Sequence, residues 1–254
     1  MNYGELSHPD IKNLAGRNTV VLPLGSLEQH GHHLPLLTDS LICEAIARRV
    51  EQELPDVLFL PLLWVGASEH HRGFPGTISL PNGLYVQVLS SILECLIQHG
   101  FRRIVLLNAH GGNDVPGLQA VYETQLRHQD LPDLWLAFFT WFTMAAEQIA
   151  AIPGLVQKKV THACELETSL ILHLKPHLVK PELARAANIP FESAFYSPDF
   201  SRPSRVAVPR AFHQLSETGA FGHPENASAA KGEQILDVTV HEVVAFLREI
   251  AAWR

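Results

Sequence analysis

Residues 19–40 read TVVLPLGSLEQHGHHLPLLTDS, a short apolar run followed by a loop rich in glycine and histidine. The run TVVLPL (19–24) predicts a buried strand, and the apolar positions of residues 40–54 recur at helical spacing. A strand that leads through a loop into a helix is the first half of the unit from which parallel sheets are built. This stretch therefore predicts an α/β fold and places histidine and carboxylate side chains directly after its first strand.

The same alternation continues along the rest of the chain. Further strands are predicted at 57–60, 103–107 and 135–140, and further helices at 84–99, about 113–128, 165–174 and about 227–252. We expect Asn113 to cap the helix that follows it. Irregular segments cover 61–82 and a Pro/Ser-rich stretch at 191–209. No repeat or linker interrupts the pattern, so we expect one domain over residues 1–254.

Composition excludes several classes of protein. The chain of 254 residues carries 19 basic and 26 acidic residues, a formal net charge of −7, and no basic run that would grip a nucleic acid. No segment approaches the roughly 20 apolar residues of a membrane-spanning helix, and the first residues lack the pattern of a secretory signal. Cys43, Cys95 and Cys164 form an odd, widely spaced set that suggests a reducing compartment. We therefore expect a cytoplasmic protein that binds neither nucleic acid nor membrane.

The 15 histidines are concentrated in loops that follow predicted strands. Three such loops carry most of the ligand-type residues, which are Glu28, His30, His32, His33 and Asp39, then Glu69, His70 and His71, and finally His110. Because the carboxyl ends of parallel strands meet at one edge of a sheet, these loops are expected to converge there. Imidazoles and carboxylates at short spacing are what a divalent metal ion needs. The sequence predicts a metal site at this edge, with solvated loop residues as the alternative.

Two of these segments have further interpretations. In NAHGGN (108–113) the glycines would permit anion binding at a helix N-terminus, but we favour the view that they clear space beside His110. In HACELETS (162–169) the carboxylates Glu165 and Glu167 begin a predicted helix, where acidic residues are also favoured by the helix dipole. Both the functional and the ordinary interpretation of these acids stay open on the sequence.

Five ordered blocks resemble the creatininase family of metal-dependent amidohydrolases. They are GSLEQHGHHLPLLTDS (25–40), GASEHHRGFPGTISL (66–80), NAHGGN (108–113), HACELETS (162–169) and GAFGHPENASAAKG (219–232). The resemblance implies a three-layer α/β/α fold with a parallel-rich central sheet and assembly as a homo-oligomer, often a hexamer. It also implies two divalent metal ions per chain, Zn²⁺ or Mn²⁺, and ligands of this kind accept Fe²⁺ as well.

The resemblance implies a role for each ligand-type residue. Glu28 and His110 would hold one metal ion, His30 would hold the other, and Asp39 would bridge the two. Creatininase itself completes its second site with a glutamate two residues after the histidine of the NAHGGN-type block, where this chain has Gly112. Relatives with the same Gly-Gly form use the glutamate of the E-T-S motif. Here that residue is Glu167.

The same resemblance, together with the chemistry of the residues, predicts the reaction. A metal-bridging water acidified to hydroxide would attack a polarised amide carbonyl, and His162 matches the active-site histidine that would shuttle the proton to the departing nitrogen. The predicted activity is hydrolysis of a cyclic or linear C–N amide bond in a small molecule, with His162 and Glu167 as catalytic residues. Residues expected to line the substrate pocket or to support the ligands are His33, Glu69, His70, Gly111, Gly112 and Trp141, and Phe142 beside Trp141 would add to an aromatic wall.

The substrate stays open at this stage. In creatininase a tryptophan and an acidic residue shortly before the active-site histidine shape the pocket, whereas residues 157–160 here read QKKV. Together with Gly112, this difference counts against strict creatinine specificity. Alternatives are a formamide deformylase, a small-peptide amidase of the same fold, and a metal-binding protein without turnover. His162 favours an enzyme, because metal binding alone would not need it.

Overall fold

A parallel sheet forms the centre of the molecule. The computed structural model describes residues 1–198 and 203–253, and within them the strands are β1 (Val20–Leu24), β2 (Leu58–Phe59), β3 (Arg103–Asn108) and β4 (Trp135–Thr140). They pair in the order β2-β1-β3-β4, and every pairing is parallel. The predicted α/β class with a parallel sheet is confirmed.

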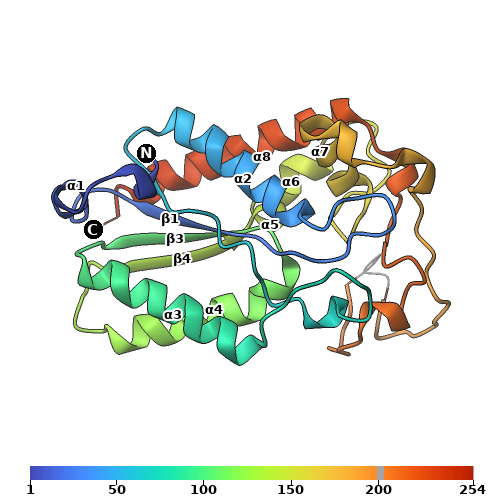
Figure 1. Cartoon of the computed structure of the whole chain (residues 1–254), viewed down its shortest axis with the longest axis horizontal. Coiled ribbons are helices and arrows are strands. Elements are labelled where there is room, and N and C mark those ends of the chain that lie inside the picture. Colours follow the sequence, from blue (N-terminus) through green and yellow to red (C-terminus); the bar gives the residue numbers. More distant parts are fainter. Residues whose placement is uncertain (199–202, 254) are drawn as a thin grey trace.

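Helices cover both faces of this sheet. Figure 1 shows α2 (Thr38–Glu53), α7 (Glu165–Leu174) and α8 (Ala229–Ile250) on one side, and α3 (Asn82–Gln98) and α4 (Asp114–Arg127) on the other. The molecule has one hydrophobic core on each face of the sheet. Alternate residues of each strand pack into these two cores, because successive side chains of a strand point to opposite faces. Val21 and Val105 pack in the core beneath α2 and α8, whereas Val20 and Ile104 pack against α3. The structure therefore has the expected three layers, with the sheet between two layers of helices.

The predicted boundaries are close to the observed ones, and the differences are local. Helix α7 has the predicted bounds, while α2 begins at Thr38, two residues before the predicted start. Short helices were missed at α1 (His8–Leu14), α5 (Trp141–Met144) and α6 (Ala146–Ala150), because segments of a few residues carry little hydrophobic periodicity. The Pro/Ser-rich stretch at 191–209 includes residues 199–202, which lie outside the described residues.

Asn113 does not act as predicted. It occupies the N-cap position of α4, but its side chain makes no capping hydrogen bond there. Instead its amide donates to the carbonyl of Gly25 at 3.1 Å and accepts from the backbone N–H of Ala67 at 2.9 Å. The side chain thus ties together the loops that follow β1 and β2, at the edge of the sheet where the ligand-type residues gather. Among the described residues, no helix is both long and apolar enough to cross a membrane.

Candidate metal centre

The loops beyond the carboxyl ends of the strands converge, as the sequence predicts. The last residues of β1, β3 and β4 lie side by side, with Leu24 paired to Asn108 and Asn108 paired to Thr140. The loop after β1 is pinned to the segment before α3 by backbone bridges, such as that between Leu27 and Ile78. The side chains brought together and buried at this edge are those of Glu28, His30, Asp39, His71, His110, His162 and Glu167.

Asp39 stands at the centre of the cluster, in the first turn of α2. Its Oδ1 lies 3.1 Å from Nε2 of His30, and its Oδ2 lies 3.2 Å from Nδ1 of His110. The hydroxyl of Ser26 also donates to Oδ2 at 2.9 Å and holds the carboxylate in this orientation. Each oxygen therefore faces a different histidine, so the carboxylate could serve two ion positions.

Glu28 is the second carboxylate of the cluster and is completely buried. Its Oε2 lies 3.1 Å from Nδ1 of His110, and its Oε1 lies 3.1 Å from Nε2 of His71 and 3.8 Å from Nδ1 of His162. Neither oxygen makes an aligned hydrogen bond to any described residue. A buried carboxylate without such partners costs several kcal/mol, roughly, unless a cation compensates it. The donor set therefore fits a metal ion.

The contacts of His30 and His110 turn one ring nitrogen of each toward the carboxylates. Nδ1 of His30 lies 3.2 Å from the carbonyl of Glu28, and a carbonyl only accepts, so Nδ1 carries a proton. Nε2, which faces Asp39 at 3.1 Å, is then the nitrogen that a metal ion would use after displacing the proton there. Nε2 of His110 lies 3.1 Å from the Ser68 hydroxyl, which leaves Nδ1 facing the carboxylates. Metal-binding histidines commonly use their other nitrogen in this way.

The described residues form three groups whose ligand atoms lie within 4.8 Å of one another. The groups are Glu28–Asp39–His110, His30–His162–Glu167 and Glu28–His71–His162. The first contains three residues of the predicted metal centre, and the second brings Glu167 from the first turn of α7 to His30. His71, in the third, had no assigned role in the sequence analysis.

Burial and mutual charge set the protonation of this cluster. Burial raises the pKa of Glu167 to about 7, although the neighbouring His30 opposes this shift. Burial lowers the pKa of His30, but the Asp39 carboxylate outweighs it and raises the value to about 9. Burial, together with charge on His30, holds the pKa of His162 well below its usual value, so that ring is neutral. The neighbouring carboxylates favour the protonated forms of His30 and His110. A metal ion would have to displace these protons in order to bind the rings.

Not every predicted pocket residue lies where it was expected. His70 lines the cavity described below, with its ring stacked at 5.7 Å on that of His110. His33 lies behind the cluster, where its Nε2 is 2.9 Å from the Thr168 hydroxyl. The side chain of Glu69 is about half exposed and lies 3.8 Å from Arg72, and it neither lines the cavity nor belongs to a candidate ligand group.

The two glycines and the tryptophan predicted for the pocket differ in where they lie. A Cβ on Gly112 would lie 2.3 Å from Nε2 of His110, so the interpretation that glycine clears space beside this histidine holds at Gly112. Gly111 lines the cavity without such crowding. Trp141 is buried in the core, whereas the neighbouring Phe142 lines the cavity, since the turn from β4 into α5 directs Trp141 inward.

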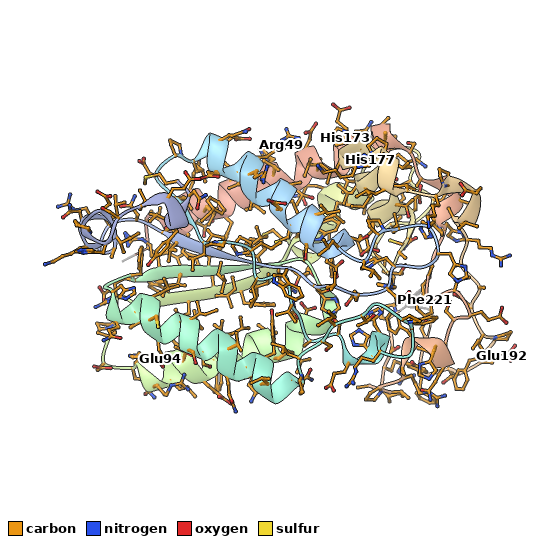
Figure 2. The ribbon with its side chains drawn as sticks, in the orientation of Figure 1. Arg49, Glu94, His173, His177, Glu192 and Phe221 are labelled. Atoms are coloured by element: carbon orange, nitrogen blue, oxygen red, sulfur yellow. The ribbon has the colours of Figure 1, made fainter. Side chains whose placement is uncertain are left out.

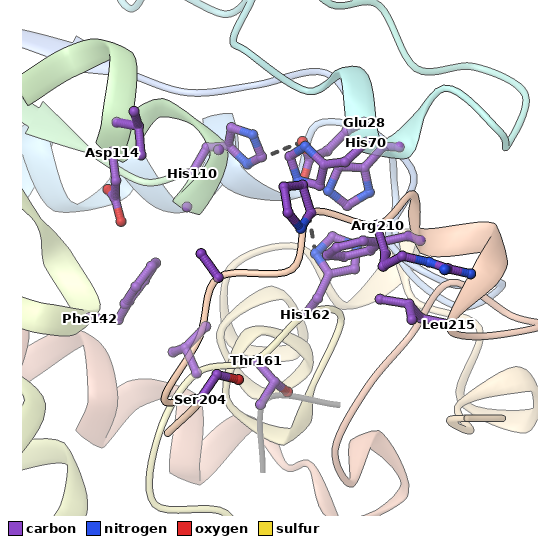
Figure 3. A pocket seen from close by; sticks show the side chains of 18 of the residues that line it. Glu28, His70, His110, Asp114, Phe142, Thr161, His162, Ser204, Arg210 and Leu215 are labelled. Carbon is purple, nitrogen blue, oxygen red and sulfur yellow. Dashed lines mark ion pairs between the residues drawn. The ribbon is translucent and has the colours of Figure 1, made fainter. Parts of the chain in front are cut away.

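A cavity of about 750 Å³ opens above the cluster. Figure 3 shows Glu28, His110 and His162 at one end and Phe142, Ser204 and Leu215 around it. Further apolar side chains of the wall are Val115, Val160, Val206, Val208 and Phe212. Lys159 and Arg210 also line the cavity and are exposed to solvent. The cavity therefore joins a polar, ligand-rich floor to predominantly apolar walls.

Gln29 is a residue of the site that the sequence analysis did not single out. Gln29, which lies between two ligand candidates in the chain, is 4% exposed and contacts both His71 and His162. Its position within EQH was the only available signal, and a lone glutamine has too many ordinary roles to be selected. Other histidines of the chain lie outside the cluster. Figure 2 places His173 and His177 in the helical layer of α7 and α8, away from the site.

The sequence profile of the creatininase family, described as creatinine amidohydrolase, matches residues 4–247. A mycofactocin precursor peptide peptidase from Mycobacterium tuberculosis is 33% identical over 267 residues, which cover 98% of this chain and 92% of that protein. A creatinine amidohydrolase from Pseudomonas putida is 30% identical over 249 residues, which cover 92% of this chain and 90% of the other.

Solved structures agree with these sequence matches. A mutant creatininase of the "Zn-Zn type" superposes with a TM-score of 0.80 and 27% identity, covering 98% of this chain and 97% of the other. A structure described as "Creatininase Mn" superposes with a TM-score of 0.79 and 28% identity over 98% and 97% of the two chains. The fold thus has close structural counterparts among creatininases.

Proposed function

Because the chain belongs to the creatininase family, we propose that it is a metal-dependent amidohydrolase that cleaves a C–N amide bond, cyclic or linear, through a dinuclear centre. The observation that carries the proposal is the shared carboxylate of Asp39. Its two oxygens face two histidines of different candidate metal groups, at 3.1 and 3.2 Å.

The ligand sets follow from these contacts. Glu28, Asp39 and His110 would hold one ion, while His30 and Glu167 would hold the other together with Asp39. Zn²⁺ and Mn²⁺ are the proposed metals, in keeping with the metals of the similar creatininase structures, and Fe²⁺ would suit the same donors. When bound, such ions acidify a water molecule and polarise the carbonyl of the substrate.

His162 would move the proton that hydrolysis requires. Its ring is neutral, because burial and the charge of His30 lower its pKa, and it lines the cavity at the ligand cluster. A neutral imidazole can accept a proton from the attacking water and return it to the departing nitrogen. Glu28 lies 3.8 Å from Nδ1 of His162 and would favour the protonated ring during this transfer.

The proposed substrate is a small-molecule amide, and peptides are a specific second candidate. Binding cavities for small molecules span about 300–1,000 Å³, so one of about 750 Å³ would be poorly filled by a single small ring such as creatinine. Val160 lines the wall in the segment where creatininase has its pocket residues. The similarity to a precursor peptide peptidase supports a short peptide as the alternative. A formamide is the third substrate to test.

The decisive experiment is a substrate panel. The protein, loaded with Zn²⁺ or Mn²⁺, would be assayed with creatinine, a formamidopyrimidine and short peptides, and its metal content measured in parallel. We expect close to two ions per chain and turnover of at least one substrate class. Two bound ions without turnover of any substrate would favour a metal-binding protein, whereas a metal content near zero would overturn the dinuclear proposal itself.

We further propose that the chain forms one catalytic domain, works in the cytoplasm and assembles as a homo-oligomer, with a hexamer expected from the family resemblance. An exposed apolar stripe on α4 supports self-association, because its residues recur at helical spacing on one face. The stripe consists of Val115, Leu118, Tyr122 and Leu126. Light scattering across a concentration series should give a multimer that Leu118→Asp weakens; a monomer throughout would contradict the proposal.

A further inference from the structure

The side chain of Gln29 is held by two backbone groups that fix which end is nitrogen. Its Oε1 accepts from the N–H of Gly31 at 3.0 Å, and its Nε2 donates to the carbonyl of Gly219 at 3.1 Å. A backbone N–H only donates and a carbonyl only accepts, so the reversed amide would lose both bonds. The orientation of this buried amide is therefore determined by the main chain.

Gly219 shows how closely the amide is held. Its φ of +80° lies in the left-handed region, and a Cβ added there would lie 2.1 Å from Oε1 of Gln29. Any larger residue at position 219 would therefore displace the amide. This contact connects the block at 219–232 to the metal centre, although none of its residues belongs to a candidate ligand group.

The second hydrogen of the Gln29 amide has one acceptor. Nε2 lies 2.9 Å from Nδ1 of His71 and 3.0 Å from Nε2 of His162. Nε2 of His162 also lies 2.8 Å from the main-chain carbonyl of Gln29, to which it must donate, so it carries a proton and cannot accept another. The amide hydrogen therefore goes to Nδ1 of His71.

These contacts determine the tautomers of both histidines. His71 accepts at Nδ1, so its own proton is on Nε2, which lies 3.1 Å from the carboxylate oxygen Oε1 of Glu28. His162 carries its proton on Nε2, which leaves the lone pair of Nδ1 on the side of Glu28. His71 consequently has no lone pair to offer a metal, whereas the lone pair on Nδ1 of His162 can accept a proton.

We propose that Gln29 is a positioning residue: its amide keeps His71 in the Nε2–H form, which sets a ring N–H 3.1 Å from Oε1 of Glu28 and leaves His71 without a lone pair to bind metal. The inference rests on the proposed function in taking Glu28 as a metal ligand. It separates the candidate groups, because Glu28–His71–His162 is then a supporting contact, whereas Glu28–Asp39–His110 and the pair His30–Glu167 remain as the proposed metal ligands. The main-chain carbonyl of residue 29 holds His162 independently of the side chain.

The test is the tautomer of each ring, measured by two-bond ¹H–¹⁵N correlations in protein labelled with ¹⁵N-histidine, both zinc-free and zinc-loaded. Variants His71→Asn and His162→Asn assign the signals. We expect Nε2–H for both rings in the wild-type protein. In Gln29→Met, His71 should lose its single tautomer while His162 keeps its own, because the carbonyl is retained. Zinc affinity should fall by about 10–100-fold, as expected for loss of a supporting partner.

Gln87→Met, on the exposed face of α3, is the matched control and should change neither quantity. A proton on Nδ1 of His71 in the wild-type protein would overturn the inference, even if Gln29→Met failed to fold. So would unchanged tautomers and affinity in a folded Gln29→Met. The proposed function fails separately, through absence of bound metal or of turnover in the wild-type protein, and the tautomers would still be measurable there.

Discussion

Replacement of Asp39 by alanine tests the shared carboxylate most directly. Asp39 offers one oxygen to each candidate site, with Oδ1 at 3.1 Å from His30 and Oδ2 at 3.2 Å from His110. Loss of this side chain should therefore weaken both sites together. Removing an outer partner of a metal ligand costs about 10–100-fold in affinity, so loss of a direct ligand should cost at least the upper value, about 100-fold at each site.

The magnitude can be followed through thermal stability. With free zinc at about 1,000 times the Kd, one site stabilises the folded protein by about 4.1 kcal/mol, and a hundredfold weaker site contributes about 1.4 kcal/mol under the same conditions. The difference of about 2.7 kcal/mol corresponds to roughly 5–11 °C in Tm for a chain of this size. Asp39→Ala should lose that much of the zinc-dependent rise in Tm for each site occupied.

The assay combines metal analysis after dialysis with thermal melts at several zinc concentrations. Asp130→Ala, at an exposed position, is the matched control and should retain the metal content and Tm rise of the wild-type protein. If Asp39→Ala lost one ion and kept the other at full affinity, Asp39 would belong to a single site. Retention of both ions would refute the bridging argument altogether.

Three further changes probe the remaining parts of the site. His162→Asn should keep its metal content but lower kcat by about 10²–10⁴-fold in turnover assays, and loss of metal instead would make His162 a required ligand. Gly112→Ala should lower stability by about 1–3 kcal/mol in urea unfolding, because its Cβ would overlap His110, whereas Gly83→Ala has open space and should not. Lys231→Met removes the cation that lies 2.6 Å from the buried carboxylate of Glu165. It should lower the free energy of unfolding by about 3–5 kcal/mol in the same measurement, and a loss below about 1 kcal/mol would contradict this account.

The fold was largely predictable because its signals are local. The run at 19–24 and the helical spacing after it are properties of adjacent residues, and both appear in the structure as β1 and α2. The four-residue helix α5 was not predictable on this basis, and its turn decides that Phe142, and not Trp141, lines the cavity. Of the two aromatic residues predicted for the pocket wall, only the second lies on it.

The candidate site was predictable only in its residue types. Glu28, His30 and Asp39 are found from their position after a strand, since parallel strands deliver their following loops to one edge. Glu69 satisfied the same criterion, yet its side chain is about half exposed beside Arg72 and belongs to no candidate ligand group. Its neighbour His71, two residues on, enters the cluster, because the short 3-10 helix Glu69–His71 turns the two side chains in different directions.

The sequence by itself determined the fold class, the edge of the sheet at which chemistry is concentrated, and most of the residues that could bind metal. The tertiary structure alone decided how those residues face one another, including the two-sided position of Asp39 and the tautomer of His71. The physical reason is that these features depend on directional contacts between distant segments. Gln29 is held by Gly219, which lies 190 residues further along the chain, and no local pattern records that contact.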